Sequence, residues 1–201
     1  MKKALTPLYT LARCPLCRQR ANTAAGCCAS CRADLFHWEV TDDYLALGRY
    51  TGKLERAVRA FKFHHATGLG DLFSQELAAA VRAQGWRPKG VCAVPLHPRR
   101  YVQRGYNQSA LLGRRTARQL GVPYQALLKR TRHTRQQARL NRLERFANVK
   151  DAFQAKPVPH GHLLLIDDVM TSGATVDACK AALRRSGAGK VFVATLAKAQ
   201  N

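Results

Sequence analysis

Apolar residues recur along the chain in two patterns, which predict two kinds of element. Some segments carry apolar residues three and four positions apart, as on one face of a helix. These are residues 53–63, 71–84, 107–120 and 174–186. Others are short, mainly apolar runs bounded by turn residues, the pattern of buried strands. These are residues 91–94, 163–167 and 191–196. Strands alternating with helices predict an α/β fold with a parallel sheet flanked by helices.

The ends of the helical segments carry further signals. Asp71 is a candidate N-cap for the second helix, and Gly121 follows the third, where a left-handed residue commonly ends a helix. Residues 139–149 have helical spacing but are very basic. Residues 35–50 show neither pattern and are interpreted as a bridging stretch.

The first 40 residues form a separate block that is rich in cysteine. Two C-x-x-C pairs stand ten residues apart, formed by Cys14, Cys17, Cys28 and Cys31. Each pair lets a tight turn aim two thiolates at one ion, and two pairs complete a tetrahedron, which is typical of a structural zinc site. Redox-active or incidental thiols are the alternative. Cys27 could replace Cys28, although Cys28 keeps the two pairs symmetric. We therefore expect a zinc module over residues 1–40 and a second domain over residues 41–201.

The size and cysteine count of the chain limit its class. It has 201 residues, with seven cysteines, an odd number that argues against a disulfide framework. The densest apolar run, residues 163–166, is far shorter than the roughly 20 residues of a membrane-spanning helix. The first residues lack the pattern of a signal peptide. We expect a cytoplasmic protein without a membrane span.

The net charge is unusual and unevenly placed. Lys and Arg together number 34 against 12 acids, for a net charge of +22. Residues 97–150 hold fourteen Lys or Arg and a single acid, Glu144. Such density attracts polyanions such as nucleic acid or phosphate esters. Within it, residues 130–145 could form a mobile hood over a ligand, a nucleic-acid groove or a solvated helix.

The segment that carries most of the candidate chemistry follows the strand predicted at residues 163–167. That strand ends in Asp167 and Asp168, whose carboxylates could hold sugar hydroxyls or a Mg²⁺ ion. A loop with small and hydroxyl-bearing side chains then opens a helix, where free backbone N–H groups suit a phosphate. The loop residues are Thr171, Ser172, Gly173, Ala174 and Thr175. An ordinary strand-to-helix turn is the alternative.

Residues 166–175 resemble the signature of type I phosphoribosyltransferases, which bind 5-phosphoribosyl-1-pyrophosphate (PRPP). The resemblance implies that Asp167 and Asp168 hold the ribose and that residues 171–175 cradle the 5-phosphate, with Mg²⁺ accompanying PRPP. It also implies a pyrophosphate loop after an earlier strand, for which the candidates are Pro95, Leu96, Arg99 and Arg104. Members that act on 6-oxopurines carry a third carboxylate where this chain has Thr171, so that chemistry is not expected.

The whole chain resembles the competence protein F (ComF) family, which joins a four-cysteine zinc module to such a domain. Beside the cysteine pairs and the PRPP loop, the shared motifs are Tyr50-Thr51-Gly52, Phe61-Lys62-Phe63, Val94-Pro95-Leu96, Arg104-Gly105-Tyr106-Asn107-Gln108, Gln137 and Arg145-x-x-Asn148-Val149. The resemblance implies PRPP binding and a role in natural transformation, in the handling or import of single-stranded DNA, with that DNA or a DNA-uptake protein as partner. Two alternatives stay open: an active phosphoribosyltransferase with an unidentified acceptor, and a general basic single-strand DNA-binding protein.

Overall fold

The fold was examined in a computed structural model, which describes residues 12–21, 27–63, 67–96, 101–102, 105–131, 149, 151–158 and 161–199. Its strands are β1 (Ala12–Arg13), β2 (Arg20–Ala21), β3 (Glu39–Val40), β4 (Tyr44–Ala46), β5 (Gly90–Ala93), β6 (Leu128–Arg130), β7 (Phe153–Ala155), β8 (Leu163–Met170) and β9 (Val191–Lys198). Its helices are α1 (Ala29–Ala33), α2 (Gly52–Phe63), α3 (Thr67–Ala83), α5 (Gln108–Leu120) and α7 (Ala174–Arg185).

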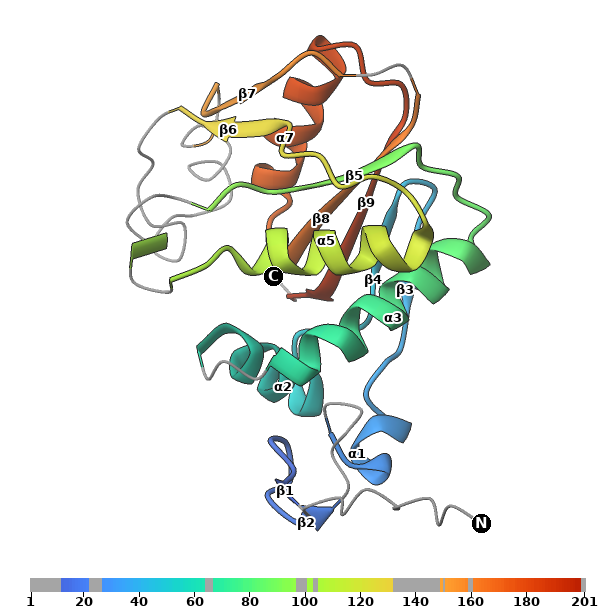
Figure 1. The fold of residues 1–201 in the computed structure, drawn as a ribbon, viewed down its shortest axis with the longest axis vertical. Helices are drawn as coiled ribbons and strands as arrows, with labels where there is room; N and C mark the ends of the chain where they lie inside the picture. The colour runs from blue at the N-terminus through green and yellow to red at the C-terminus, as the bar shows by residue number, and fades with distance from the viewer. Residues whose placement is uncertain are drawn as a thin grey trace, which may run out of the picture.

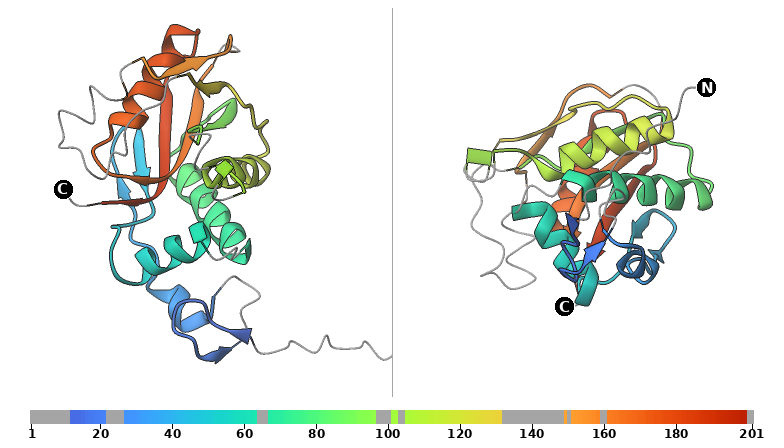
Figure 2. Two further views of the ribbon diagram at one scale, coloured as in Figure 1. Left: turned by 90° about the vertical axis from the view of Figure 1, so that its left-hand side faces the viewer. Right: turned by 60° about the horizontal axis from the view of Figure 1, so that its bottom comes forward.

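The centre of the molecule is a five-stranded sheet with the order β3-β4-β9-β8-β5. The strands β4, β9, β8 and β5 run parallel to one another, and β3 is antiparallel to β4 at one edge. Helix α7 covers one face, while α2, α3 and α5 lie on the other (Figures 1 and 2). The expected α/β class is therefore confirmed.

Both faces of the sheet are apolar because both are covered by helices. Leu164 and Ile166 of β8 belong to the buried cluster that includes side chains of α2, α3 and α5. Leu163 and Leu165, which alternate with them, belong to the cluster that includes side chains of α7. This arrangement explains why the strand is a continuous apolar run in the sequence.

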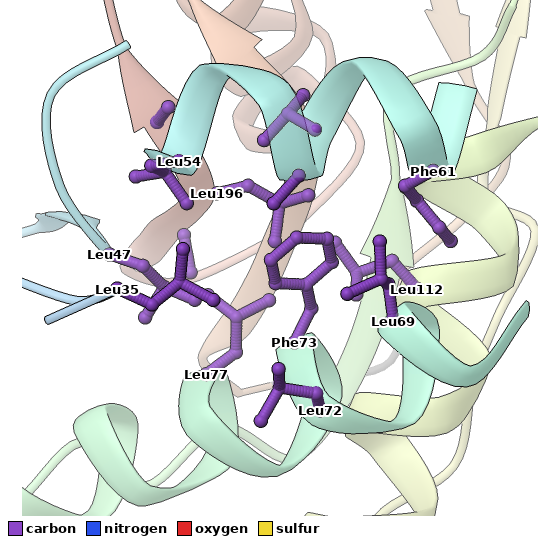
Figure 3. Close-up of a cluster of buried hydrophobic side chains, with 14 of the residues drawn as sticks. Leu35, Leu47, Leu54, Phe61, Leu69, Leu72, Phe73, Leu77, Leu112 and Leu196 are labelled. Carbon is purple, nitrogen blue, oxygen red and sulfur yellow. The ribbon is translucent and has the colours of Figure 1, made fainter. Parts of the chain in front are cut away.

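The larger cluster extends from the sheet toward the N-terminal part of the chain. Figure 3 shows Leu35, which follows α1, beside Leu47 and near Leu54 of α2 and Leu77 of α3. The buried side chains of Cys14 and Leu16 belong to the same cluster. The N-terminal part of the chain therefore packs against the helical layer (Figure 1).

Two features differ from the sequence-based expectation. Helix α3 begins at Thr67, so Asp71 lies within the helix and is not its cap. The apolar face extends one turn further because Leu69 is fully buried, and Oδ1 of Asp71 lies 3.4 Å from Nε of Arg115. The bridging stretch contains β3 and β4, and all three residues of β4 are buried in the sheet.

The expected segments at α2, α5, α7, β5, β8 and β9 agree with the structure to within a few residues, whereas β1, β2, α1, β6 and β7 were not predicted. Helix α5 is capped by the side chain of Asn107 and ends at Gly121, which is left-handed with φ 72°. Strands β8 and β9 continue to Met170 and Lys198, beyond their expected ends. The segment 139–149 lies outside the described residues except for Val149, which is buried. No helix among the described residues is both long and apolar enough to cross a membrane.

Candidate functional site

The expected ribose residues lie within β8, and the expected pyrophosphate segment follows the neighbouring strand β5. Strands β5 and β8 are parallel, with Ala93 opposite Ile166, and the N–H of Val94 donates to the carbonyl of Ile166 at 3.0 Å. Pro95 and Leu96, both half-buried, therefore leave β5 at the sheet edge where Asp167 and Asp168 lie. Ligands of open α/β sheets bind beyond this edge. Arg99 and Arg104, the other two pyrophosphate candidates, lie outside the described residues.

Asp167 is half-buried within the sheet edge and accepts hydrogen bonds at one oxygen. The hydroxyl of Ser109 donates to its Oδ1 at 3.0 Å, and the N–H of Asp168 donates to the same atom at 2.9 Å. Burial, and then repulsion from Asp168, raise the pKa of Asp167 to about 7, against the opposing effect of these hydrogen bonds and of Lys62. Near neutral pH this carboxyl can therefore either accept or donate a hydrogen bond.

Asp168 is paired with a lysine that sequence reasoning assigned no role. Nζ of Lys62, in the last turn of α2, lies 3.0 Å from Oδ2 of Asp168. Their side chains are only 14% and 17% exposed. Oδ1 of Asp168 accepts from the N–H of Val169 at 2.6 Å. The carboxylate is thus held in one orientation before any ligand is bound.

The segment Tyr106 to Gln108 explains how Lys62 is placed. The hydroxyl of Tyr106 donates to the carbonyl of Phe61 at 2.7 Å, and Nε2 of Gln108 donates to the carbonyl of Lys62 at 3.4 Å. Nδ2 of Asn107 donates to the carbonyl of Val94 at 3.1 Å, while its Oδ1 caps α5. This segment therefore joins the ends of α2 and β5 to the start of α5. Two motifs shared with the family contain these residues, so the sequence marked the residues. It did not indicate which groups they contact.

The loop between β8 and α7 presents groups that can bind an anion. Gly173 stands at the N-cap of α7 with φ 81°, where it contributes no side-chain cap to the first N–H groups. Oγ of Ser172 is buried and has no hydrogen-bond partner among the described residues. A buried hydroxyl left in this state costs about 1–3 kcal/mol, which a ligand acceptor would recover. Thr171 is exposed, Thr175 is half-buried and Ala174 is buried.

The second candidate site lies in the cysteine region, by which we mean the described residues 12–21 and 27–36. The sulfur atoms of Cys14, Cys17, Cys28 and Cys31 all lie within 4.8 Å of one another. Those of Cys17 and Cys28 are 3.7 Å apart. Tetrahedral zinc with Zn–S bonds of about 2.3 Å places its ligand sulfurs about 3.8 Å apart. The cluster could therefore hold a metal ion, and both its donor set and this spacing fit zinc.

The backbone favours the thiolate at one of the four cysteines, whereas burial raises the pKa of Cys31 to about 12. Burial would raise the pKa of the Cys14 thiol, but hydrogen bonds from the N–H groups of Cys28, Cys17 and Leu16 together lower it to about 6. Cys27 is buried but is not part of the cluster, and burial, followed by the charges of Cys14 and Cys28, raises its pKa to about 11. The two symmetric C-x-x-C pairs thus form the cluster.

The parallel sheet, with the acid pair and the loop before α7 at its carboxyl edge, defines an α/β protein with a candidate ligand site and an N-terminal four-cysteine cluster. Competence protein F of Haemophilus influenzae is 30% identical over 196 residues, covering 92% of this chain and 84% of that protein. DNA utilization protein YhgH of Salmonella typhimurium is 34% identical over 187 residues, covering 90% and 81%. The chain belongs to the competence protein F family.

A third relative matches a smaller part of the chain. Competence protein ComFC of Streptococcus pneumoniae is 35% identical over 107 residues, covering 52% of this chain and 46% of that protein. No family model matches the chain.

Two solved structures are similar at a low level. Glutamine PRPP amidotransferase from B. subtilis has a TM-score of 0.47 and 17% identity, covering 69% of this chain and 30% of that one. Adenine phosphoribosyltransferase from Leishmania tarentolae has a TM-score of 0.47 and 14% identity, covering 81% and 94%. Both TM-scores are below 0.5.

Proposed function

We propose that the chain binds PRPP with Mg²⁺ and supports the handling or import of single-stranded DNA in natural transformation. In this proposal residues 1–40 are a structural zinc module and residues 41–201 form the PRPP-binding domain. The observation that carries the PRPP part is the loop before α7, where the buried Ser172 hydroxyl has no hydrogen-bond partner in the described part of the chain and Gly173 leaves the helix without a side-chain cap.

Each part of PRPP has a matching group in this arrangement. The 5-phosphate would accept hydrogen bonds from the first N–H groups of α7 and from the hydroxyls of Thr171, Ser172 and Thr175. Asp167 and Asp168 would accept from the ribose hydroxyls. Magnesium would neutralise phosphate charge, and carboxylate oxygens are ligands that it prefers. Pro95, Leu96, Arg99 and Arg104 are our candidates for contact with the pyrophosphate.

The DNA part rests on the relatives and on charge. Two relatives that this chain matches over most of their length are named for competence and for DNA utilization. The net charge of +22, dense over residues 97–150, supports attraction to a nucleic-acid backbone. A cytoplasmic location agrees with this role, and a DNA-uptake protein is a further candidate partner.

Calorimetric titration of PRPP and Mg²⁺ into the zinc-loaded full chain tests the PRPP part. We expect micromolar binding by the wild type and a loss of about 100-fold in Asp167→Asn/Asp168→Asn, since hydrogen bonds to charged groups contribute about 1.5–3 kcal/mol each. The matched control is Asp34→Asn/Asp71→Asn, which removes two acids elsewhere. No binding by the wild type, or equal binding by the two double variants, would overturn this part.

The same samples separate binding from catalysis. Pyrophosphate release that depends on an added acceptor, and that is lost in Asp168→Asn, would indicate a working phosphoribosyltransferase. PRPP binding without release supports the binding role. DNA binding that the acid substitutions leave unchanged, in a protein that does not bind PRPP, would instead favour the general single-strand DNA-binding function.

A further inference from the structure

A groove separates the cysteine region from helix α2. The turn between β1 and β2, which carries Cys14 and Cys17, points toward the first turns of α2 (Figure 1). The space between them is about 710 Å³ and is lined by Pro15 and Arg18 from the turn and by Gly52, Glu55, Arg56 and Arg59 from the helix. None of these residues belongs to the acid-pair site.

The lining is basic, and its charges are available to a ligand. Three arginines face one acid, Glu55. Arg18, Arg56 and Arg59 are exposed. Arg59 lies 3.5 Å from Glu55 in an exposed pair with side chains 65% and 37% exposed, an interaction that contributes little in water. An incoming phosphate can therefore replace Glu55 as the partner of Arg59 at small cost.

Arg18 is held in place by the turn that carries two of the clustered thiols. Its N–H donates to the carbonyl of Cys14 at 2.8 Å, and the N–H of Cys14 donates to the carbonyl of Gln19 at 2.9 Å. Arg18 has φ 63°, in the left-handed region that non-glycine residues rarely adopt. The geometry of the four-cysteine cluster therefore fixes the position of one wall of the groove.

The chemistry of the lining matches a phosphodiester backbone. Guanidinium groups form bidentate hydrogen bonds with phosphate oxygens. Arg56 and Arg59, three residues apart, lie on one face of α2. The first N–H groups of α2, which begins at Gly52, add partial positive charge. The described lining includes no aromatic ring on which a base could stack. The contacts would therefore be to phosphates and independent of base sequence.

We propose that this groove binds the phosphate backbone of single-stranded DNA, with Arg18, Arg56 and Arg59 as the contacting residues. The inference rests on the DNA part of the proposed function and gives it a location. It assigns the cysteine region a second task beside holding a metal: it supplies one wall of the binding groove.

The test is the salt dependence of binding to a fluorescent oligodeoxythymidine, measured by anisotropy with the zinc-loaded full chain. The groove variant is Arg18→Gln/Arg56→Gln/Arg59→Gln. The control, Arg118→Gln/Arg184→Gln/Arg185→Gln, removes the same charge from exposed positions on α5 and α7. Each phosphate contact contributes about 0.7 to the slope of log affinity against log salt. For the groove variant we expect the magnitude of this slope to fall by about 2 and the affinity for the oligonucleotide to fall at least tenfold. For the control variant we expect little change in either quantity.

A single substitution distinguishes loss of contact from loss of folding. Arg18→Gly removes the side chain and also relieves the left-handed backbone, which costs a non-glycine residue about 1–2 kcal/mol. We expect an unchanged or higher Tm, full zinc content and a slope lower by about 0.7. Wild-type DNA binding by this variant would contradict the proposal.

The outcomes separate failure of the location from failure of the function. If the wild type binds DNA and the two triple variants weaken equally, or the groove variant does not weaken, the groove is not the site and the DNA role stands. If the wild type does not bind the oligonucleotide, the DNA part and the groove are both wrong, while PRPP titration still reports the other part. An acidic peptide that binds the groove when DNA does not would assign the surface to a protein partner and overturn the proposal.

Discussion

The cysteine region and the sheet region (residues 39–199) are organised by different interactions. The cysteine region contains two-residue strands and a five-residue helix, and four sulfurs within 4.8 Å of one another lie at its centre. In the sheet region, β8 and β9 are eight residues each, and Leu164, Leu165 and Ile166 are fully buried. So small a region builds little core of its own, and we propose that a bound metal ion stabilises it, whereas the sheet is stabilised by its own side chains.

The difference has a consequence for how each region responds to damage. A metal cluster concentrates its stabilisation in a few bonds, so its loss is nearly all-or-none. A packed core distributes stabilisation over many contacts, so truncation of one buried side chain lowers the free energy of unfolding without removing it. The shared cluster around Leu35, Leu47 and Leu54 is the place where damage to one region can reach the other.

Metal removal is the largest expected effect. Chelation should unfold the cysteine region, since structural zinc supplies on the order of 10 kcal/mol to such sites, and leave the sheet folded. In hydrogen-exchange measurements, the backbone amides of residues 27–36 should then lose their protection, while those of residues 163–166 stay protected. Re-addition of zinc is the control. Equal loss in both regions would show that they do not fold separately.

Truncation of a buried side chain in the sheet region is the counterpart of metal removal. Its expected effect on stability is the second largest. Leu165 is fully buried in the cluster that includes side chains of α7, so Leu165→Ala should cost about 2–5 kcal/mol of unfolding free energy. Thermal denaturation should show a lower Tm, with zinc content unchanged before the transition. Val40→Ala, at a position 36% exposed, is a control with a small expected effect. Zinc loss from folded Leu165→Ala would contradict the distinction.

The two regions should also respond to pH with opposite sign. The raised pKa of Asp167, about 7, means that the folded state binds more protons than the unfolded state between pH 4 and 7. The stability of the sheet region should therefore fall across this window as pH rises. The full shift corresponds to about 4 kcal/mol, and solvent screening of the half-buried carboxyl reduces the expectation to about 2 kcal/mol. Metal–thiolate sites instead gain stability as pH rises.

Tryptophan fluorescence can isolate the sheet region in this measurement. The chain has two tryptophans, and Trp86 stacks on Phe192 of β9 at 4.6 Å between ring centroids. In a Trp38→Phe background, urea denaturation followed by Trp86 should show the pH slope, and Asp167→Asn should flatten it. A slope that persists in Asp167→Asn would assign the effect to another group.

The parts of the fold that sequence predicted are those set by local pattern. Residues 163–166 are apolar on both faces of a covered strand, and Gly121 follows α5 because a left-handed residue ends the helix. The four-cysteine cluster followed from spacing alone. Strand β4 was missed because three residues are too few to show a periodic pattern, and the start of α3 was predicted four residues late because Asp71 resembles an N-cap.

The arrangement of the candidate site depended on contacts that local pattern does not contain. Lys62 and Asp168 lie 106 positions apart, and Ser109 and Asp167 lie 58 apart. These pairs form only because α2 and α5 pack on one face of the sheet, with the end of α2 and the start of α5 near the same sheet edge. The acid pair could be predicted as a site, but its neighbours could not.

Helix α2 belongs to both proposed sites, and this has a thermodynamic consequence. It lines the groove from Gly52 to Arg59, and Lys62, three residues further and about 4.5 Å along the helix axis, pairs with Asp168. Leu54, Ala57 and Val58 are buried along its inner face, so it can shift only as a unit. Suppose that a ligand at the acid pair displaces Lys62 from Asp168 and thereby changes the affinity of the groove for DNA by some factor. DNA bound in the groove must then change the affinity of the acid-pair site for that ligand by the same factor. Such coupling is reciprocal by necessity, and titrating either ligand in the presence of the other measures it.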